Sequence, residues 1–348
     1  MKRRAFLRTV GGAAGAAALV PRMLAQDAFS DKVAGLPRRV LGRTGQKLSV
    51  VGFPGLALIH YDQEKCTQSV HSAFEKGINY YDVAPAYGNG QCETKLGIAL
   101  QGLDRDKYFL ACKTKKRDKD GARQELETSL RLLKTDRFDL YQLHHLVRPA
   151  EVKQALGPDG ALEAILKAKE EGKVKYIGFS AHTTKGALEA MKGFKFDTVM
   201  FPINFVEYYT KGFGKEVLAL AAEQGAGVLA IKPLSWGAWP SDAKKTREWW
   251  YRTVETVDDI RLAMSFALSQ DNVVAGIPPS FLDLLDRCIE ACRTVKPLDE
   301  AGAAKLKAMA ENRSSIFTRE EAQVAMNPQH WAPCYPDSPH ESGQGHLV

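Results

Sequence analysis

Residues 78–112, INYYDVAPAYGNGQCETKLGIALQGLDRDKYFLAC, contain two β-prone runs separated by a loop and a helical pattern. The β-prone runs lie at 78–83 and 107–112, and the stretch from Cys92 to Gln101 has the apolar spacing of an amphipathic helix. A strand, a helix and a second strand in this order are typical of a parallel sheet. This stretch therefore predicts one strand–helix–strand unit.

The same alternation continues along the chain. Further β-prone runs lie at 48–53, 138–143, 174–179, 196–202, 227–232 and 273–277. Helical patterns lie between them at 64–76, 121–133, 161–171, 185–192, 215–224 and 257–269. Eight repeats within about 250 residues predict an α/β fold with a single (β/α)8 TIM barrel. Two Rossmann-like domains are the alternative, but the nearest glycine fingerprint, Gly88 to Glu93, lacks its third glycine.

The ends of the chain differ in composition from its middle. We expect an export signal at 1–25, a polar linker at 26–37, the barrel at 38–295 with an N-terminal β-hairpin at 39–50, and a helical, flexible C-terminal extension at 296–348. The apolar stretch at 9–20 is too short to span a bilayer, so no stable membrane insertion is expected. Arg3-Arg4-Ala5-Phe6-Leu7-Arg8 resembles the twin-arginine motif, which predicts the twin-arginine export machinery as partner and a periplasmic or otherwise exported location. An ordinary secretory signal is the alternative.

Charge and cysteine placement exclude two further classes. The chain has 348 residues and a formal charge of +7, of which +5 lies before Asp27, so the body is too weakly basic for a nucleic-acid surface. Six cysteines in a chain this long, without a Cys-x-x-Cys motif, favour buried free thiols over a disulfide framework. Cys288 and Cys292 share a helix face, but no further ligand follows at zinc spacing, and no metal site is expected.

Several ionisable residues lie where predicted strands end. Asp82, Lys113 and His144 follow the second, third and fourth strands, and Tyr87 lies in the loop after Asp82. In a TIM barrel the carboxyl ends of the strands meet at one face, where the active site lies. A carboxylate, an ammonium, a phenol and an imidazole at that face predict a proton-transfer site.

The residues around these four positions resemble the aldo-keto reductase family. The resemblance rests on Asp82-Val83-Ala84-Pro85-Ala86-Tyr87-Gly88, on 109–114, on 135–144 and on 172–180, and it covers about Arg39 to Ala291. It implies that Tyr87 is the general acid, that Lys113 lowers the pKa of Tyr87, that Asp82 holds Lys113, and that His144 orients a carbonyl substrate. It also implies NADP as the hydride-carrying cofactor, with NAD as the alternative.

The same resemblance assigns cofactor contacts to later strand ends. They are Ser180, Asn204, Ile231, Lys232, Pro233, Leu234, Ile277, Pro278, Ser280 and Arg287. Ala181, Met200 and Ile231 depart from the common family pattern and resemble a subgroup that carries a four-cysteine iron–sulfur domain, which is missing here because only Cys334 follows Cys292.

These observations predict reduction of an aldehyde or a ketone by an exported enzyme. The alternative is a non-catalytic barrel that acts as an exported binding protein. Trp236, Trp239, Trp249 and Trp250 are expected either to shape a substrate lid or to cover the flank of the barrel. His330, Cys334, His340 and His346 have irregular spacing, which favours a solvated tail over a metal site.

Overall fold

Eight parallel strands form the centre of the fold in this computed structural model, which describes residues 29–327. They are β4 (Phe53–Pro54), β5 (Tyr80–Asp82), β6 (Phe109–Thr114), β7 (Phe138–Leu146), β8 (Val174–Ala181), β9 (Thr198–Pro202), β10 (Gly227–Ile231) and β13 (Val273–Ile277), paired in that order. The sheet closes where Val51 bridges Gly276, because Gly276 N donates to Val50 O at 2.9 Å and Gly52 N donates to Gly276 O at 3.0 Å. The predicted (β/α)8 barrel is confirmed.

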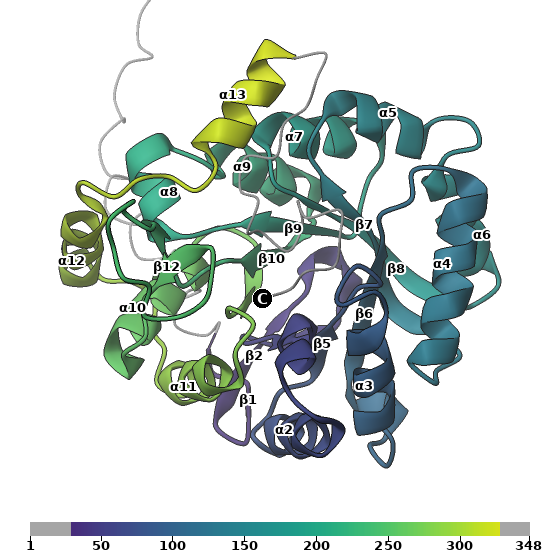
Figure 1. Cartoon of the computed structure of the whole chain (residues 1–348), viewed down its shortest axis with the longest axis horizontal. Helices are drawn as coiled ribbons and strands as arrows, with labels where there is room; N and C mark the ends of the chain where they lie inside the picture. Colours follow the sequence, from purple (N-terminus) through teal and green to yellow (C-terminus); the bar gives the residue numbers. More distant parts are fainter. Residues whose placement is uncertain (1–28, 328–348) are drawn as a thin grey trace, which may run out of the picture.

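Helices follow the strands and surround the barrel (Figure 1). The expected ones are α2 (Gln63–Glu75), α3 (Gln91–Ala99), α4 (Lys119–Leu132), α6 (Ala161–Glu170), α7 (Thr184–Gly193), α9 (Lys215–Gln224) and α10 (Val257–Leu268), followed by α11 (Leu282–Cys292). Side-chain caps fix several starts; for example, Asp118 accepts from Gly121 N at 2.7 Å. The short helices α5 (Pro149–Leu156) and α8 (Phe205–Lys211) were not expected, since each has only about two turns.

A small antiparallel sheet lies against the amino ends of the barrel strands. It contains β1 (Lys32–Val33), β2 (Leu36–Val40) and β3 (Lys47–Ser49), so the expected hairpin is present. Within the segment expected as a linker at 26–37, Ala34 and Gly35, both at positive φ, form a tight turn that pairs β1 with β2. Leu41 and Leu48 are fully buried and close the base of the core inside the barrel.

The hydrophobic core has two parts. Inside the barrel, Tyr80, Phe109, Leu140 and Leu229 pack together, while a larger cluster fills the layer between strands and helices. Five cysteines, Cys66, Cys92, Cys112, Cys288 and Cys292, are buried free thiols, as predicted. Cys334 lies outside the described residues.

The C-terminal part packs on the barrel through α12 (Glu300–Ala310) and α13 (Thr318–Met326). Between these helices, the Ser315 hydroxyl and Ile316 N donate to the buried carboxylate of Glu207 at 2.6 and 2.7 Å. The helical start of the extension is confirmed in α12, whereas α13 was not expected. The predicted export signal and the His residues at 330, 340 and 346 lie outside the described residues.

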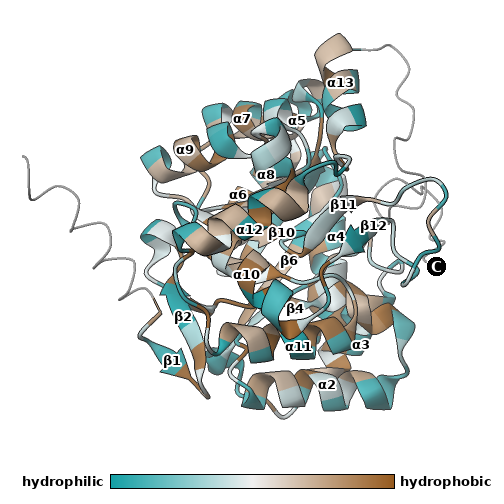
Figure 2. Ribbon diagram, turned by 90° about the vertical axis from the view of Figure 1, so that its left-hand side faces the viewer, coloured by the Kyte–Doolittle hydropathy of each residue, from teal (hydrophilic) through white to brown (hydrophobic). Residues whose placement is uncertain are grey.

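A short hairpin of β11 (Ser235–Ala238) and β12 (Tyr251–Thr253) lies on the side of the barrel opposite the β1–β2 strands (Figure 2). It follows the seventh barrel strand and so lies near the carboxyl ends. No helix among residues 29–327 has the length and apolar character needed to cross a membrane.

Candidate active site

A narrow cavity opens at the carboxyl ends of the barrel strands. Its lining residues come from β4 and β5 and their loops, from β7 to β10, from the segment before β12, and from the loop after β13. They are Pro54, Gly55, Leu56, Asp82, Tyr87, His144, Ser180, His182, Met200, Ile231, Lys232, Trp249, Trp250, Tyr251, Ile277, Pro278, Pro279 and Ser280. The cavity holds about 70 Å³, room for only a few water molecules.

Asp82, Lys113 and Tyr87 form a connected group beside this cavity. The Lys113 ammonium, completely buried, donates to Asp82 Oδ2 at 2.5 Å, to Val83 O at 3.1 Å and to the Tyr87 hydroxyl at 3.3 Å. The aromatic rings of Tyr87 and His144 meet edge to face, with centroids 5.7 Å apart. The structure therefore brings together all four residues that the sequence placed in the proton-transfer site.

Burial and charge act in opposite directions on the pKa values of this group. Burial raises the pKa of Tyr87 to about 12, and the nearby Lys113 ammonium only partly opposes that rise. Burial alone would lower the pKa of Lys113, but the attraction of Asp82 and Tyr87 outweighs it and raises that pKa. Lys113 therefore lowers the pKa of Tyr87 in the expected direction, but burial outweighs this effect, and the phenol is protonated at neutral pH.

Two residues that support Asp82 were not expected. The Tyr80 hydroxyl donates to Asp82 Oδ1 at 3.2 Å, and Gln142 Nε2 donates to the same oxygen at 3.5 Å. Burial raises the pKa of Asp82, and Lys113 followed by these hydrogen bonds opposes the rise. Strand alternation could have found both residues, since Tyr80 and Asp82 share one face of β5, and Gln142 and His144 share one face of β7.

The expected cofactor residues divide into two sets. Ser180, Ile231, Lys232, Ile277, Pro278 and Ser280 line the cavity. Pro233, Leu234, Asn204 and Arg287 do not. Asn204 is instead the N-cap of α8, where its Oδ1 accepts from Glu207 N at 3.0 Å, and Arg287 Nη1 donates to Glu255 O at 2.9 Å.

Lys232 occupies an unusual place for a cation. Its side chain is buried, its Nζ lies 3.3 Å from Nε2 of His182, and the ring centres of Trp250 and Phe317 are each 5.5 Å away. Burial lowers the pKa of Lys232 to about 7, partly opposed by the Glu320 carboxylate. Lys232 is the only lysine or arginine among the residues that line the cavity.

His145, His182 and Glu320 gather beside Lys232. One potential ligand atom from each lies within 4.8 Å of the others, a spacing at which a metal ion can be considered. However, burial followed by the charges of Lys115, Lys232 and Arg117 lowers the pKa of His145 well below its usual range. The positive charges of Lys115, Lys232 and Arg117 would repel a divalent cation at this position, and we assign no metal to the cluster.

His182 and Glu320 were missed for different reasons. His182 comes one residue after the end of β8 and two residues after Ser180; continued strand alternation would place the two side chains on the same side, and that spacing was a usable signal. Glu320 lies on α13, 138 residues later in the chain, and no local pattern connects it with His182. His145, expected to lie in a loop or the core, faces this cluster from β7.

Trp249 and Trp250 form one wall of the cavity. This position agrees with the expectation that the tryptophan cluster shapes a lid over the substrate. Trp239 Nε1 donates to Trp249 O at 2.7 Å, which ties the wall to the chain that follows β11. Trp236 and Trp239 do not line the cavity.

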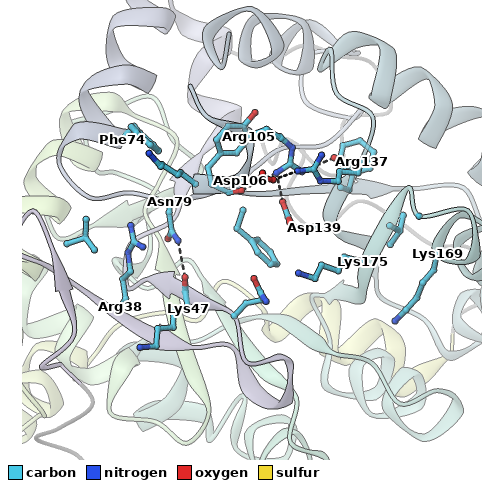
Figure 3. A pocket seen from close by; sticks show the side chains of 18 residues that line it. Arg38, Lys47, Phe74, Asn79, Arg105, Asp106, Arg137, Asp139, Lys169 and Lys175 are labelled. Atoms are coloured by element: carbon cyan, nitrogen blue, oxygen red, sulfur yellow. Dashed lines mark hydrogen bonds and ion pairs between the residues drawn. The ribbon is translucent and has the colours of Figure 1, made fainter. Parts of the chain in front are cut away.

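A larger cavity of about 980 Å³ lies at the opposite, amino ends of the strands. Figure 3 shows its charged lining, in which Arg105 pairs with Asp139 at 2.8 Å and Arg137 pairs with Asp106. Active sites of TIM barrels lie at the carboxyl ends, so this cavity is not the candidate site.

Known proteins resemble the chain in both sequence and fold. It is 30% identical over 217 residues to a probable aldo-keto reductase of Glycine max, covering 57% of this chain and 59% of that protein. It is 28% identical over 213 residues to an L-galactose dehydrogenase of Arabidopsis thaliana, covering 57% of this chain and 66% of that protein. The match thus spans less than two thirds of each relative.

Solved structures share the fold at lower identity. The holo form of an aldo-keto reductase from Bacillus halodurans superimposes with a TM-score of 0.64 at 23% identity, covering 82% of this chain and 99% of that one. An aldo-keto reductase from Klebsiella pneumoniae in complex with NADPH gives a TM-score of 0.60 at 19% identity, covering 80% and 96%. The sequence profile of the aldo/keto reductase family matches residues 55–311, which include all four residues of the proton-transfer site, and the chain therefore belongs to the aldo/keto reductase family.

Proposed function

We propose that the chain reduces an aldehyde or a ketone to the alcohol, with a nicotinamide dinucleotide as hydride source and Tyr87 as proton donor. The observation that carries the proposal is the hydrogen-bonded group Asp82–Lys113–Tyr87 beside His144 at the carboxyl ends of the strands. Carbonyl reduction needs an acid at the oxygen, and this group holds a protonated phenol at the cavity wall.

Each of the four residues has a distinct part in this reaction. Tyr87 donates the proton to the carbonyl oxygen, and the Lys113 ammonium at 3.3 Å stabilises the phenolate that remains. Asp82 keeps Lys113 charged and in place through the 2.5 Å contact. His144, against the edge of Tyr87, orients the carbonyl oxygen toward the phenol.

The donor set around the cavity fits a nicotinamide dinucleotide. Ser180 and Ser280 offer hydroxyls, Ile231 and Ile277 offer apolar faces for a flat ring, and Lys232 offers a cation for phosphate. The bound cofactor would supply the hydride. NADP is favoured because a neighbour of the same fold is known in complex with NADPH, although Arg287 is held by Glu255 and Asp283 and is not assigned to the extra phosphate.

We also propose that the chain is exported in folded form by the twin-arginine machinery. Arg3 and Arg4 before Phe6 and Leu7 support this proposal, together with the weakly apolar stretch that follows them. The enzyme would then act in the periplasm or outside the cell.

Binding of the dinucleotide is the first test. We expect NADPH to change the tryptophan fluorescence of the purified chain, because Trp249 and Trp250 line a cavity of about 70 Å³ and must move to admit a dinucleotide. NADH is titrated in parallel to compare the two cofactors. A folded chain that binds neither at millimolar concentration would contradict the reductase proposal and favour the exported binding protein.

Exchange of Tyr87 is the second test. Tyr87→Phe should lower the rate of NADPH consumption with small aldehydes by roughly 10²–10⁴-fold, the contribution of general acid catalysis, while dinucleotide binding remains. Tyr208→Phe is the matched control, since Tyr208 packs on Phe266 and does not line the cavity. A Tyr87→Phe variant with most of its turnover would show that another group is the acid.

A further inference from the structure

Lys232 is buried, and no carboxylate of residues 29–327 forms an ion pair with it. Within residues 29–327, its contacts are His182 Nε2 at 3.3 Å and the rings of Trp250 and Phe317, while Glu320 acts on it only through its charge. Buried lysines normally pair with an acid, because an unpaired buried charge is costly. Lys113 in the same molecule shows the paired arrangement, with Asp82 at 2.5 Å.

The backbone holds Lys232 in a strained conformation. Its φ is +56°, in the left-handed region, and His145 on the other side of the cluster has φ +58°. Such a conformation is unfavourable for a non-glycine residue and is found preferentially at functional sites. Two strained residues therefore direct side chains into one small polar cluster at the cavity wall.

We propose that Lys232 is a nucleophilic amine that attacks the carbonyl carbon of a short aldehyde bound in the cavity and forms a Schiff base with it. Lysines in apolar surroundings are the amines that proteins use for this chemistry. The Trp250 and Phe317 rings provide such surroundings, and Lys232 is among the residues that line the cavity. The condensation needs no dinucleotide, so the inference does not rest on the reductase proposal.

The reaction is balanced by groups that are present. The neutral Lys232 nitrogen bonds to the carbonyl carbon, and one of its two protons passes through His182 Nε2 to the aldehyde oxygen, which gives a neutral carbinolamine. His182 then carries the remaining nitrogen proton to the carbinolamine hydroxyl, which leaves as water while the C=N bond forms. Amine and aldehyde thus give imine and water, and addition of water reverses the reaction.

Burial makes the neutral amine available near pH 7. Burial lowers the pKa of Lys232 to about 7, so at pH 7 about half of the molecules carry a neutral Lys232. This neutral fraction is roughly 10³-fold larger than that of an ordinary lysine. The titratable groups that face Lys232 are His182 just after β8, His145 on β7 and Glu320 on α13. Burial, followed by nearby positive charges, lowers the pKa of His145 well below its usual range.

The size of the cavity limits which carbonyl compounds can reach Lys232. A volume of about 70 Å³ admits a carbonyl compound of only a few carbon atoms while the tryptophan wall stays in place. An aldehyde presents one substituent at the carbon under attack, where a ketone presents two. We therefore assign short aldehydes as the class that Lys232 captures.

The test is reductive trapping followed by peptide mass spectrometry. The purified chain is incubated with propanal and sodium cyanoborohydride, which reduces the imine to a stable secondary amine. We expect Lys232 to be alkylated at least tenfold faster at pH 7 than exposed lysines. Its rate should rise between pH 5 and 7 and level off above pH 8, where exposed lysines continue to accelerate.

Variants separate this reaction from the alternatives. Lys232→Arg keeps the charge but cannot form the imine and should abolish the fast label, whereas Lys115→Arg, a half-buried lysine outside the cavity, should leave it unchanged. His182→Gln should slow labelling at least tenfold. Tyr208→Phe, at a residue outside the cavity, should label as the wild type does, and the labelling is measured without NADPH, so a failed reductase test does not affect this result. Labelling of Lys232 no faster than that of exposed lysines in the folded wild type, or fast labelling at Lys115 instead, would overturn the proposal.

Discussion

Replacing Lys232 by methionine should make the folded chain more stable at neutral pH. Methionine has a similar length and no charge, so it removes the cost of burying the ammonium between Trp250 and Phe317. The ordinary lysine pKa of 10.5 falls to about 7 in the folded chain. At about 1.36 kcal/mol per pH unit, this difference corresponds to about 5 kcal/mol.

The sign of the pH dependence follows from proton binding. Between about pH 7 and pH 10.5 the unfolded chain holds a proton on Lys232 that the folded chain has released, so the stability of the wild type rises with pH. The Lys232→Met variant lacks this pH-dependent contribution to the free energy of unfolding. Its advantage should be about 3–5 kcal/mol at pH 6–7, about 2 kcal/mol at pH 9, and absent above pH 10.5.

Urea denaturation of both proteins at pH 6.5 and pH 9 measures this difference. Lys175→Met is the matched control, because Lys175 is exposed and its replacement should give the same small change at both pH values. Wild-type and Lys232→Met stabilities that run parallel with pH would refute the reasoning, since they would show that Lys232 stays charged in the folded chain.

Three other predictions concern the proton-transfer site and export. Asp82→Asn leaves the buried Lys113 ammonium without its partner and should cost about 3–5 kcal/mol in unfolding free energy, whereas adding Lys113→Met should recover part of that loss; equal stability of the two variants by urea denaturation contradicts this. Because burial raises the pKa of Tyr87 to about 12, the reverse oxidation of an alcohol, which needs the phenolate as base, should accelerate about tenfold per pH unit between pH 7 and 10, and a plateau below pH 9 would be evidence against Tyr87. Replacing Arg3 and Arg4 by lysine should leave precursor in the cytoplasm on immunoblots of cell fractions, and unchanged export would remove the twin-arginine assignment.

The barrel was predictable because each strand is a short, nearly continuous apolar run bounded by turn residues. The expected 227–232 and 273–277 runs, for example, became β10 (Gly227–Ile231) and β13 (Val273–Ile277). Buried parallel strands have this pattern because both of their faces are covered. The β1 strand was not predictable in the same way, since its two residues, Lys32 and Val33, are exposed and are paired only through the turn at Ala34–Gly35.

The proton-transfer site was predictable because its members lie at strand ends or in the loop that follows one. Asp82, Lys113 and His144 needed only the barrel to bring them together. The direction of the Tyr87 pKa could not be read from the sequence, because it depends on how far burial outweighs Lys113. Asn204 is a comparable case: a strand-end amide suits a carboxamide, but here it caps the next helix.

Only part of the cluster around Lys232 could be predicted from the sequence. His182 was within reach of a strand-alternation argument, but Glu320 and Phe317 come from the segment at the end of the described chain. Their approach to Lys232 depends on how α13 packs on α7, which is a tertiary contact without a local sequence signal.

The carboxylate of Glu207 sets where this molecule can be shortened. The family's sequence pattern ends at residue 311, yet Ser315 and Ile316 hold that carboxylate from beyond the boundary. A chain cut after residue 311 would keep every strand of the barrel but would leave a carboxylate in the interior with two of its hydrogen bonds missing. The stretch that matches the family profile is therefore shorter than the unit that folds here, and a fragment that ended at residue 311 would have an unsatisfied carboxylate in its interior.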